Sequence, residues 1–392
     1  MKKRKWEKAV SILLAGTMAA MIFAGCGSSE STEGNTSSAG SQDTASEEAA
    51  QTSASGASSA SGLSNEEVIR KAAEQGKVGN WGLGNEYEVQ ALLAKYDLPT
   101  DYLSEDFTMD GFDDDSILLA SAMTYNELGL VMNDYEGGYG YGDSIGIIDM
   151  NDEGVAMLED NIFCTREFAE ENPETVKAFL YASLKGWQYA VEHPEEAAEI
   201  VYEAGSSVSQ EHQNYMAEEV AKLVTTDTNG NTVESGDIGK MDEEAMQQTL
   251  DIAKQYVQLD DSGAQTKLES LTLDDIRDTQ YFDAVQGSNG TFNPEKTEVS
   301  IQLKWLPQAQ FMGYFVAQSK GYYNDVGLTV SIESGGGDIS ETTAVNNGTV
   351  DFGVTWVSNL ASANAGGMDL LEVAQIFQRS GLVLVYKPEN FK

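Results

Sequence analysis

The sequence predicts an α/β fold of two domains or two lobes. Segments with the apolar pattern of strands alternate with segments of helical periodicity, an order that is typical of α/β domains. Apolar residues make up 41% of the 392-residue chain, which is enough to form a substantial core. About 330 residues follow position 63, and that length suits two domains or a two-lobed fold.

The chain begins with the pattern of a secretory signal. Basic residues at positions 2–5 precede an apolar run from Ala9 to Ala24, which ends at Gly25 and Cys26. A basic start, a short apolar run and small residues before the cleavage site are typical of a signal peptide. The run is shorter than the roughly 20 apolar residues that a spanning helix needs. We therefore predict a signal peptide over residues 1–25 and an extracytoplasmic protein.

Cys26 is the predicted lipidation site. The Phe-Ala-Gly triplet before it resembles the lipobox of bacterial lipoproteins, although Phe23 stands where Leu is usual. The resemblance implies that Cys26 is diacylated and becomes the first mature residue. Two acyl chains suffice for stable anchoring, so we expect a lipid anchor on the extracytoplasmic face of the cell membrane as the only membrane contact. The alternative is an ordinary signal peptide followed by a chance cysteine.

Residues 26–63 predict a disordered tether. They consist mainly of Ser, Ala, Gly, Thr, Glu and Gln, and almost none of them has a large apolar side chain. Such a segment cannot bury enough surface to offset the entropy of ordering it. We expect it to hold the folded part away from the membrane.

Composition excludes several classes of function. The net charge is −41, and this acidic excess argues against binding to nucleic acid or adsorption on anionic lipid. It favours solubility and self-repulsion, so we expect a monomer. With two cysteines and two histidines, the chain offers no Cys/His cluster of metal-binding spacing, and we predict no metal, cofactor or catalytic residues. Cys164 is expected to be a buried, inert thiol.

The first folded segment, residues 64–152, contains alternating helices and strands. We predict a helix over 64–75, a strand over 77–81, and a glycine-rich turn that leads into a helix over 86–96. Between residues 107 and 130 we expect a strand, an acidic turn, a helix and a second strand.

The second segment, residues 153–285, is mostly helical. A strand is predicted within residues 154–164, and helices over 173–191, 194–204, 210–224 and 243–257. In the first of these helices Val176, Phe179, Leu180, Leu184 and Trp187 recur at helical spacing. The polar residues 286–298 then read as a linker.

The last segment, residues 299–392, returns to alternating elements. Strands are predicted over 299–305, 328–334 and 350–356, with helices over 311–323 and 339–348 between them.

Four of the predicted strands end in an aromatic residue. These residues are Trp81, Tyr125, Trp305 and Trp356. Ligands of open α/β sheets bind at the carboxyl ends of strands. Aromatic side chains can stack on a planar ring of a ligand, and nearby amides and carboxylates can hydrogen-bond to the donor and acceptor atoms at its edge. The pattern therefore favours a site for a small aromatic heterocycle, the alternative being that these aromatics are ordinary core.

Sequence motifs then show a resemblance to a known family. The segments "LKWLPQAQFMGYFVAQSKGYYNDVGLTVSIESGGGDIS", "VDFGVTW" and "AQIFQRSG" resemble the start of solute-binding proteins of ABC importers, in the thiamin-pyrimidine-synthase-like family. "GKVGNWGLGNEYEVQALLAK" and "MTYNE" resemble its middle, and "NPETVKAFLYASLKGWQYAVEHPEEA" its last third. The resemblance implies a type II periplasmic-binding-protein fold, with two α/β lobes around a ligand cleft, and an ABC permease as partner.

The order of these pieces departs from the family, because the piece that comes first there comes last here. We interpret this as a circular permutation, the alternative being a rearranged gene model. In this interpretation residues 64–152 form lobe 2, residues 153–285 and 299–392 form the carboxyl and amino parts of lobe 1, and residues 286–298 join the family's old ends. A single covalent crossing between the lobes is expected near residues 143–153.

The resemblance and the strand-end pattern together give the expected site and ligand. The expected ligand-binding residues are Trp81, Asn85, Glu86, Tyr87, Tyr125, Asn126, Glu127, Trp305, Gln310, Tyr314, Trp356, Asn359 and Gln378. Riboflavin or another flavin, a thiamin pyrimidine precursor, and some other solute all stay open, and the motifs look more like the riboflavin branch. A binding or sensor protein without a transporter, and an enzyme like thiamin pyrimidine synthase, are the alternative functions.

Overall fold

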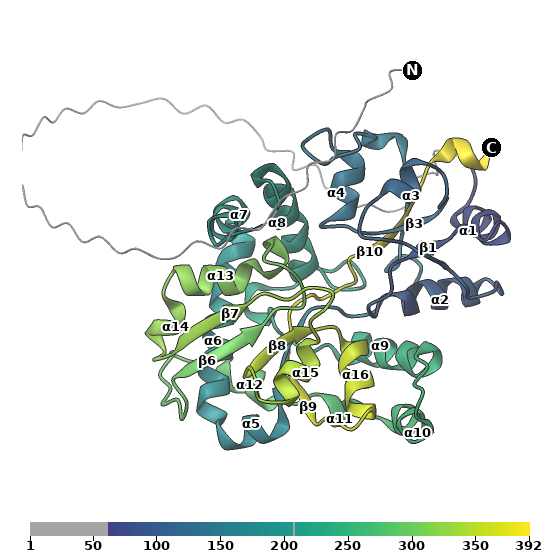
Figure 1. Ribbon diagram of the computed structural model, residues 1–392. Coiled ribbons are helices and arrows are strands. Elements are labelled where there is room, and N and C mark those ends of the chain that lie inside the picture. Colours follow the sequence, from purple (N-terminus) through teal and green to yellow (C-terminus); the bar gives the residue numbers. More distant parts are fainter. Residues whose placement is uncertain (1–61, 207) are drawn as a thin grey trace, which may run out of the picture. The chain divides into compact units, whose positions relative to one another are not determined.

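The computed structural model describes residues 62–206 and 208–392 (Figure 1). The predicted signal peptide, Cys26 and most of the predicted tether lie outside the described residues. No helix of the described part is long and apolar enough to cross a membrane. The described residues belong to one compact unit, and its elements confirm the α/β class.

A five-stranded mixed sheet organises the larger part of the fold. Its strand order is β7-β6-β8-β5-β9. The strands are β5 (Asn161–Thr165), β6 (Glu298–Gln302), β7 (Thr329–Glu333), β8 (Phe352–Thr355) and β9 (Leu370–Gln375). β6 runs parallel to β7 and β8, whereas β5 is antiparallel to β8 and β9. Cys164 is buried in β5 as a free thiol, as expected.

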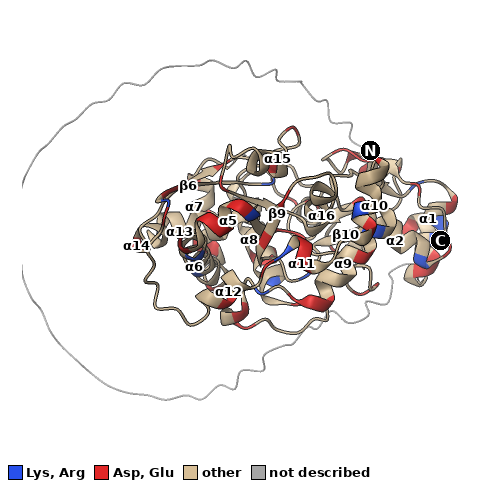
Figure 2. Cartoon of the chain, turned by 90° about the horizontal axis from the view of Figure 1, so that it is seen from below, with Lys and Arg blue, Asp and Glu red and all other residues tan. Residues whose placement is uncertain are grey.

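Helices pack around this sheet. They are α5 (Arg166–Glu171), α6 (Pro173–Glu192), α7 (Pro194–Glu203), α8 (Gln210–Thr225), α9 (Glu243–Tyr256), α10 (Ser262–Ser270), α11 (Leu273–Ile276), α12 (Gln280–Val285), α13 (Met312–Ser319), α14 (Tyr322–Asp325), α15 (Glu341–Asn346) and α16 (Val357–Ala365). The four long helices predicted between residues 173 and 257 are all present within a residue or two of their expected ends. Acidic side chains are spread over α5, α9 and α12 (Figure 2).

The buried helix α6 lies very close to α13. A Cβ atom at Gly186 would come within 2.1 Å of the Gly313 carbonyl oxygen, and one at Gly313 would meet the ring of Trp187 at 2.2 Å. Two glycines are therefore required where the helices touch, since any side chain would push them apart.

Two small sheets form the smaller part of the fold. β3 (Ala120–Met123), β10 (Leu382–Tyr386) and β4 (Gly146–Asp149) form an antiparallel sheet with β10 in the middle. β1 (Gly79–Asn80) pairs in parallel with β2 (Leu103–Ser104). The helices here are α1 (Asn65–Glu74), α2 (Glu86–Lys95), α3 (Asp110–Asp113) and α4 (Glu127–Met132). Ser64 and Glu67 form a capping box, which explains why α1 starts at Asn65.

The position of β10 corrects two expectations. Residues 299–392 were expected to stay together in one lobe, but β10 crosses to the small sheet and pairs there with β3 and β4. The chain therefore links the two parts twice, through residues 150–160 and through residues 376–381, where a single crossing was expected. Hydrophobic alternation could not reveal this, because a buried central strand such as β10 is apolar on both faces.

Two further differences concern element ends. Residues 107–119 contain the short helix α3 in place of the expected first strand, and the segment after β3 is the helix α4, where a strand was expected. β6 ends at Gln302, three residues before the expected end at Trp305. The polar segment expected as a linker does separate α12 from β6, and residues 286–297 contain no helix or strand.

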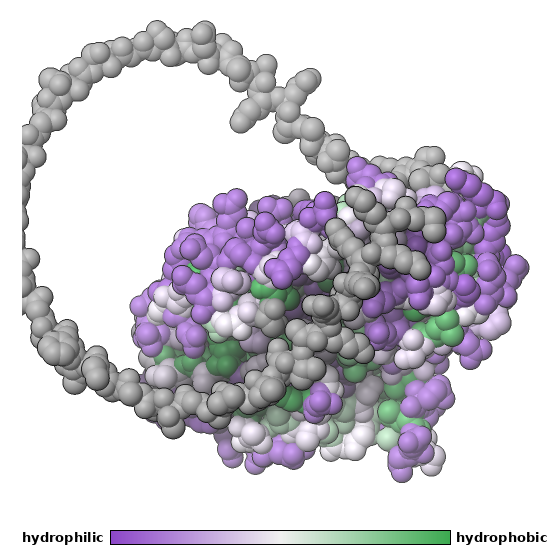
Figure 3. Space-filling view, turned by 45° about the horizontal axis from the view of Figure 1, so that its top comes forward, coloured by the Kyte–Doolittle hydropathy of each residue, from purple (hydrophilic) through white to green (hydrophobic). Residues whose placement is uncertain are grey.

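The visible face of the described residues is mostly hydrophilic (Figure 3).

Candidate functional site

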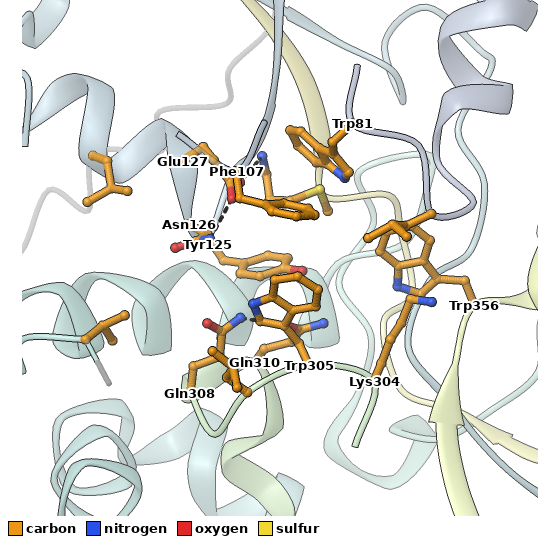
Figure 4. A pocket seen from close by; sticks show the side chains of 15 residues that line it. Trp81, Phe107, Tyr125, Asn126, Glu127, Lys304, Trp305, Gln308, Gln310 and Trp356 are labelled. Atoms are coloured by element: carbon orange, nitrogen blue, oxygen red, sulfur yellow. Dashed lines mark hydrogen bonds between the residues drawn. The ribbon is translucent and has the colours of Figure 1, made fainter. Parts of the chain in front are cut away.

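An aromatic cavity of about 240 Å³ lies where the two parts of the fold meet (Figure 4). From the smaller part its walls take Trp81, Leu83, Phe107, Met123, Tyr125, Asn126, Glu127 and Leu130. From the larger part they take Val208, Lys304, Trp305, Leu306, Gln308, Gln310 and Trp356. Of the thirteen residues expected to bind ligand, seven line this cavity.

Two of the four predicted aromatic residues directly follow a strand, and the other two stand in the loops after their strands. Trp81 directly follows β1 and Trp356 directly follows β8, while Tyr125 stands two residues after β3. Trp305 lies in the loop after β6, where its ring contacts Phe107 with centroids 5.0 Å apart and planes inclined by 54°. The rings of Trp81, Phe107, Tyr125, Trp305 and Trp356 surround one space (Figure 4).

Asp160 supports the cavity wall from behind. Its carboxylate accepts a 2.9 Å hydrogen bond from Trp356 Nε1 and another 2.9 Å bond from Gln310 Nε2. The side chain is buried, with 1% of its surface exposed. Burial raises the pKa of Asp160 to about 7, against the lowering effect of the Gln310 and Trp356 hydrogen bonds and of the Lys304 charge. Asp160 thus fixes an indole and an amide of the wall together.

Gln310 uses one amide hydrogen and its oxygen in bonds to the protein, so Gln308 is the freer amide. The Gln308 side chain donates from Nε2 to Gln310 Oε1 over 2.8 Å. One hydrogen of the Gln308 amide group and its oxygen remain for a ligand. The loop that carries both is held by the backbone N–H of Ala309, which donates to Gln213 Oε1 on α8.

On the opposite wall, Asn126 and Glu127 form a second polar group. Glu127 Oε2 accepts from the backbone N–H of Met123 at 3.0 Å, and Glu127 Oε1 accepts from Asn126 Nδ2 at 2.6 Å. Burial raises the pKa of the Glu127 carboxyl despite these bonds. Asn126 Oδ1 faces His212 Nε2 at 2.8 Å.

Lys304 brings a positive charge to the cavity. Its ammonium group lies over the Trp356 ring, 4.4 Å from the centroid, and 3.3 Å from Glu341 Oε1. Cation–π contact and ion pairing both hold it at the wall. Among residues 62–206 and 208–392 there is no group of three His, Cys, Asp or Glu that could hold a metal ion.

Three expected site residues lie in the core or in the scaffold instead. Tyr314 is fully buried in α13, where its ring packs edge-on against Trp187. Gln378 donates to the backbone oxygens of Lys240 and Gln375, so it supports the second linking segment. The Asn85 side chain is buried and its Nδ2 faces the sulfur of Met123 at 3.7 Å. Their sequence motifs therefore reflect packing in this structure.

The other three line a neighbouring groove of about 550 Å³. Glu86 accepts from the backbone N–H of Gly84 and Tyr87 follows it on α2. Asn359, on α16, donates to the Leu83 carbonyl over 3.2 Å, and Ser358 donates to the Gly84 carbonyl over 3.2 Å. Asn359 thus ties α16 to the turn at residues 82–84, an indirect role that the sequence did not suggest.

A family model decides the relationship of the chain. The model described as NMT1/THI5 like matches residues 76–197 and 308–391, which together are more than half of the sequence. The chain belongs to the NMT1/THI5-like family. This is a family of periplasmic solute-binding proteins, and the mixed α/β structure is compatible with its fold. No curated protein matches the chain.

Sequence reasoning missed part of the site in this NMT1/THI5-like protein. Phe107, Lys304 and Gln308 all line the cavity. Lys304 and Gln308 are close neighbours of Trp305, and a wider window around that aromatic would have included them. Asp160 and Phe107 stand in segments without a strand-end signal, so only the folded structure brings them to the cavity.

Proposed function

We propose that this protein is an extracytoplasmic solute-binding protein that delivers a small planar aromatic heterocycle to an ABC importer. Membership of the NMT1/THI5-like family supports the class of protein. The observation that carries the ligand class is the cavity with five aromatic rings from both parts of the fold. Planar rings stack on such walls with little loss of side-chain entropy.

Both candidate ligand types remain in the proposal, and the cavity size ranks them. A volume of about 240 Å³ is below the roughly 300–1,000 Å³ of most drug-sized sites. It therefore favours a one-ring ligand, such as a thiamin pyrimidine precursor, over the three fused rings of riboflavin. Gln308 and Asn126 each have one amide hydrogen that bonds to no other group among the described residues. These donors suit a ring with nitrogen or carbonyl acceptors.

The role that we propose is binding without catalysis. Polar groups in and behind the walls are engaged mainly with one another: the buried Asp160 with Trp356 and Gln310, and Glu127 with Asn126 and the backbone N–H of Met123. Such bonding suits a site that holds a ligand in a fixed orientation.

Anchoring by Cys26 and the circular permutation belong to the same proposal. The two chain ends of the described part support the permutation, because Lys71 Nζ on α1 donates to the Phe391 carbonyl over 2.8 Å (Figure 1). A circular permutation opens the parent chain at one place, and the two ends made there become the new termini. The termini of a permuted chain are therefore expected to lie close together. Cys26 is proposed to carry two acyl chains and to anchor the protein on the extracytoplasmic face.

Mass spectrometry of the ligand that co-purifies with the protein tests the proposed function. Native mass spectra should show one ligand molecule bound per protein. The ligand released from the protein should be a heterocycle whose ring absorbs in the ultraviolet or visible range. An apo protein that binds neither riboflavin nor the hydroxymethyl aminopyrimidine of thiamin, while it binds a sugar or a peptide, would contradict the proposal.

A further inference from the structure

A row of hydrogen bonds runs from the cavity wall into the protein behind it. It starts at the Met123 backbone N–H and passes through Glu127, Asn126 and His212 to Tyr135. His212 stands on α8 of the larger part, and the other four residues belong to the smaller part. His212 and Tyr135 do not line the cavity, whereas Asn126 and Glu127 do.

The direction of these bonds follows from one fixed donor. The backbone N–H of Met123 can only donate, so Glu127 Oε2 accepts. With the carboxylate ionised, Glu127 Oε1 also accepts, and the group facing it must be the amide nitrogen of Asn126. The Asn126 oxygen therefore faces His212.

The same reasoning fixes the imidazole. His212 Nε2 lies 2.8 Å from Asn126 Oδ1 and must carry the hydrogen, so Nδ1 accepts from the Tyr135 hydroxyl at 2.5 Å. Burial lowers the pKa of His212 to about 4, so at neutral pH the ring has one donor and one acceptor.

Contacts next to His212 keep α8 against this wall. Tyr215, one turn further along α8, donates to the Thr124 carbonyl over 2.7 Å. Its ring fills the space above Gly129 so closely that a Cβ atom there would lie 2.3 Å from Tyr215 Cε1. The distance between His212 and Asn126 is therefore set by packing as well as by their own hydrogen bond.

We propose that His212 is a positioning residue that fixes the Asn126 amide, so that Asn126 offers its remaining N–H to an acceptor atom of the ligand. One amide hydrogen is used by Glu127 and the oxygen by His212, which leaves this single hydrogen as the donor. The inference rests on the proposed function, because the ligand is the heterocycle proposed above. It adds that the ligand carries a ring nitrogen or a carbonyl oxygen at the Asn126 side.

The first test measures the imidazole tautomer by nitrogen NMR. The full chain labelled at histidine gives signals from two residues, and the His193→Gln variant assigns them. We expect His212 to show a protonated Nε2 and an unprotonated Nδ1, and Tyr135→Phe to shift the Nδ1 signal. The Nδ1–H tautomer, or a charged ring at neutral pH, would overturn the inference.

The second test measures binding of two probes, riboflavin and the hydroxymethyl aminopyrimidine of thiamin. The amide of His212→Gln can reach the position of Nε2 and donate to Asn126, whereas that of His212→Asn reaches only the position of Nδ1. We expect His212→Asn to weaken binding about tenfold, as loss of one oriented hydrogen bond does. His212→Gln should stay close to wild type, and His193→Gln is the matched control.

Thermal unfolding of each variant separates a local effect from lost folding. Equal affinities of His212→Asn and His212→Gln in folded proteins would overturn the positioning role. If neither probe binds wild type, the proposed ligand class fails, and the tautomer measurement still decides how Asn126 is oriented.

Discussion

Asp160 orients two side chains of the cavity wall at once, although it is itself buried behind them. Both of its oxygens accept N–H bonds, one from Trp356 and one from Gln310. Asp160 thereby links the Trp356 indole to the Gln310 amide, both of which were expected from the sequence to bind ligand. The sequence could not predict Asp160 itself, because nothing local distinguishes it from the neighbouring Glu159.

The variant Asp160→Asn tests this role. An amide would turn an N–H toward one of the two donors, so one hydrogen bond is lost and one donor is left unpaired. We expect the free energy of unfolding to fall by about 1–3 kcal/mol and ligand affinity to fall about tenfold. Chemical denaturation and ligand titration measure the two effects.

Asp369→Asn is the control for this substitution. Asp369 pairs with Arg166 at the surface and 72% of its side chain is exposed, so little change is expected. A folded Asp160→Asn protein with wild-type stability and affinity would show that the wall does not depend on Asp160.

At the scale of elements, helices were predicted better than strands. The amphipathic spacing in α6, α8 and α9 repeats over several turns, and so it identifies these helices securely. β1 and β2 have two residues each, too few for any alternation to show. The apolar residues of β10 predict burial but not which sheet the strand joins, because pairing partners are set by the tertiary structure.

The contact of α6 with α13 gives a prediction at this scale. Gly186→Ala would place a Cβ atom 2.1 Å from the Gly313 carbonyl, which is backbone and cannot move aside. We expect the free energy of unfolding to fall by about 1–3 kcal/mol or more, as overpacked cores show. Gly236→Ala, where a Cβ atom meets nothing within 4 Å, should leave stability nearly unchanged. Similar denaturation midpoints for the two variants would refute this account of the helix contact.

At the scale of the whole molecule, two covalent segments connect the parts of the fold. Residues 150–160 and residues 376–381 both connect the two parts, so neither part is attached through a single segment. We therefore predict that joining residue 391 to residue 64 and opening the chain at Gly290 changes the distance between the parts very little. Spin labels on the two parts, measured without ligand, should give matching distributions for the native and the reordered chain. A clearly narrower distribution in the reordered chain would contradict this.

Buried carboxyl groups predict how stability depends on pH. Burial raises the pKa of Glu105 and of Glu372 to about 8, and that of Asp160 to about 7. The folded protein therefore holds protons that the unfolded chain has already released above about pH 5, and stability falls as pH rises through these values. His212 has the opposite sign, but its lowered pKa of about 4 affects stability only below about pH 6.5.

The resulting prediction is that the free energy of unfolding is smaller near pH 8.5 than near pH 6.5. Urea denaturation at the two pH values measures it. Glu372→Gln removes one of the titrating groups and should reduce the difference. Equal or greater stability at the higher pH would show that these carboxyls titrate normally.

How far the site itself could be predicted depends on what each residue does. Trp81, Tyr125, Trp305 and Trp356 line the cavity, and the sequence pointed to them because each stands at or shortly after the end of a strand. Asn85, Tyr314 and Gln378 were expected from motifs, but they hold the scaffold, and motif and pattern alone do not separate support from contact. Long-range partners such as His212 need the folded chain.

The central claim is that the aromatic cavity binds a planar heterocycle, and titration of that ligand against Trp305→Ala tests it most directly. Loss of the indole removes ring contact and buried apolar area, so affinity should fall by about 1–3 kcal/mol in a protein that remains folded. Trp356→Ala should behave alike. Tyr202→Ala, which truncates a ring that is 45% exposed and not in the cavity wall, should bind as wild type does. Unchanged affinity of both tryptophan variants, with folding intact, would contradict the claim.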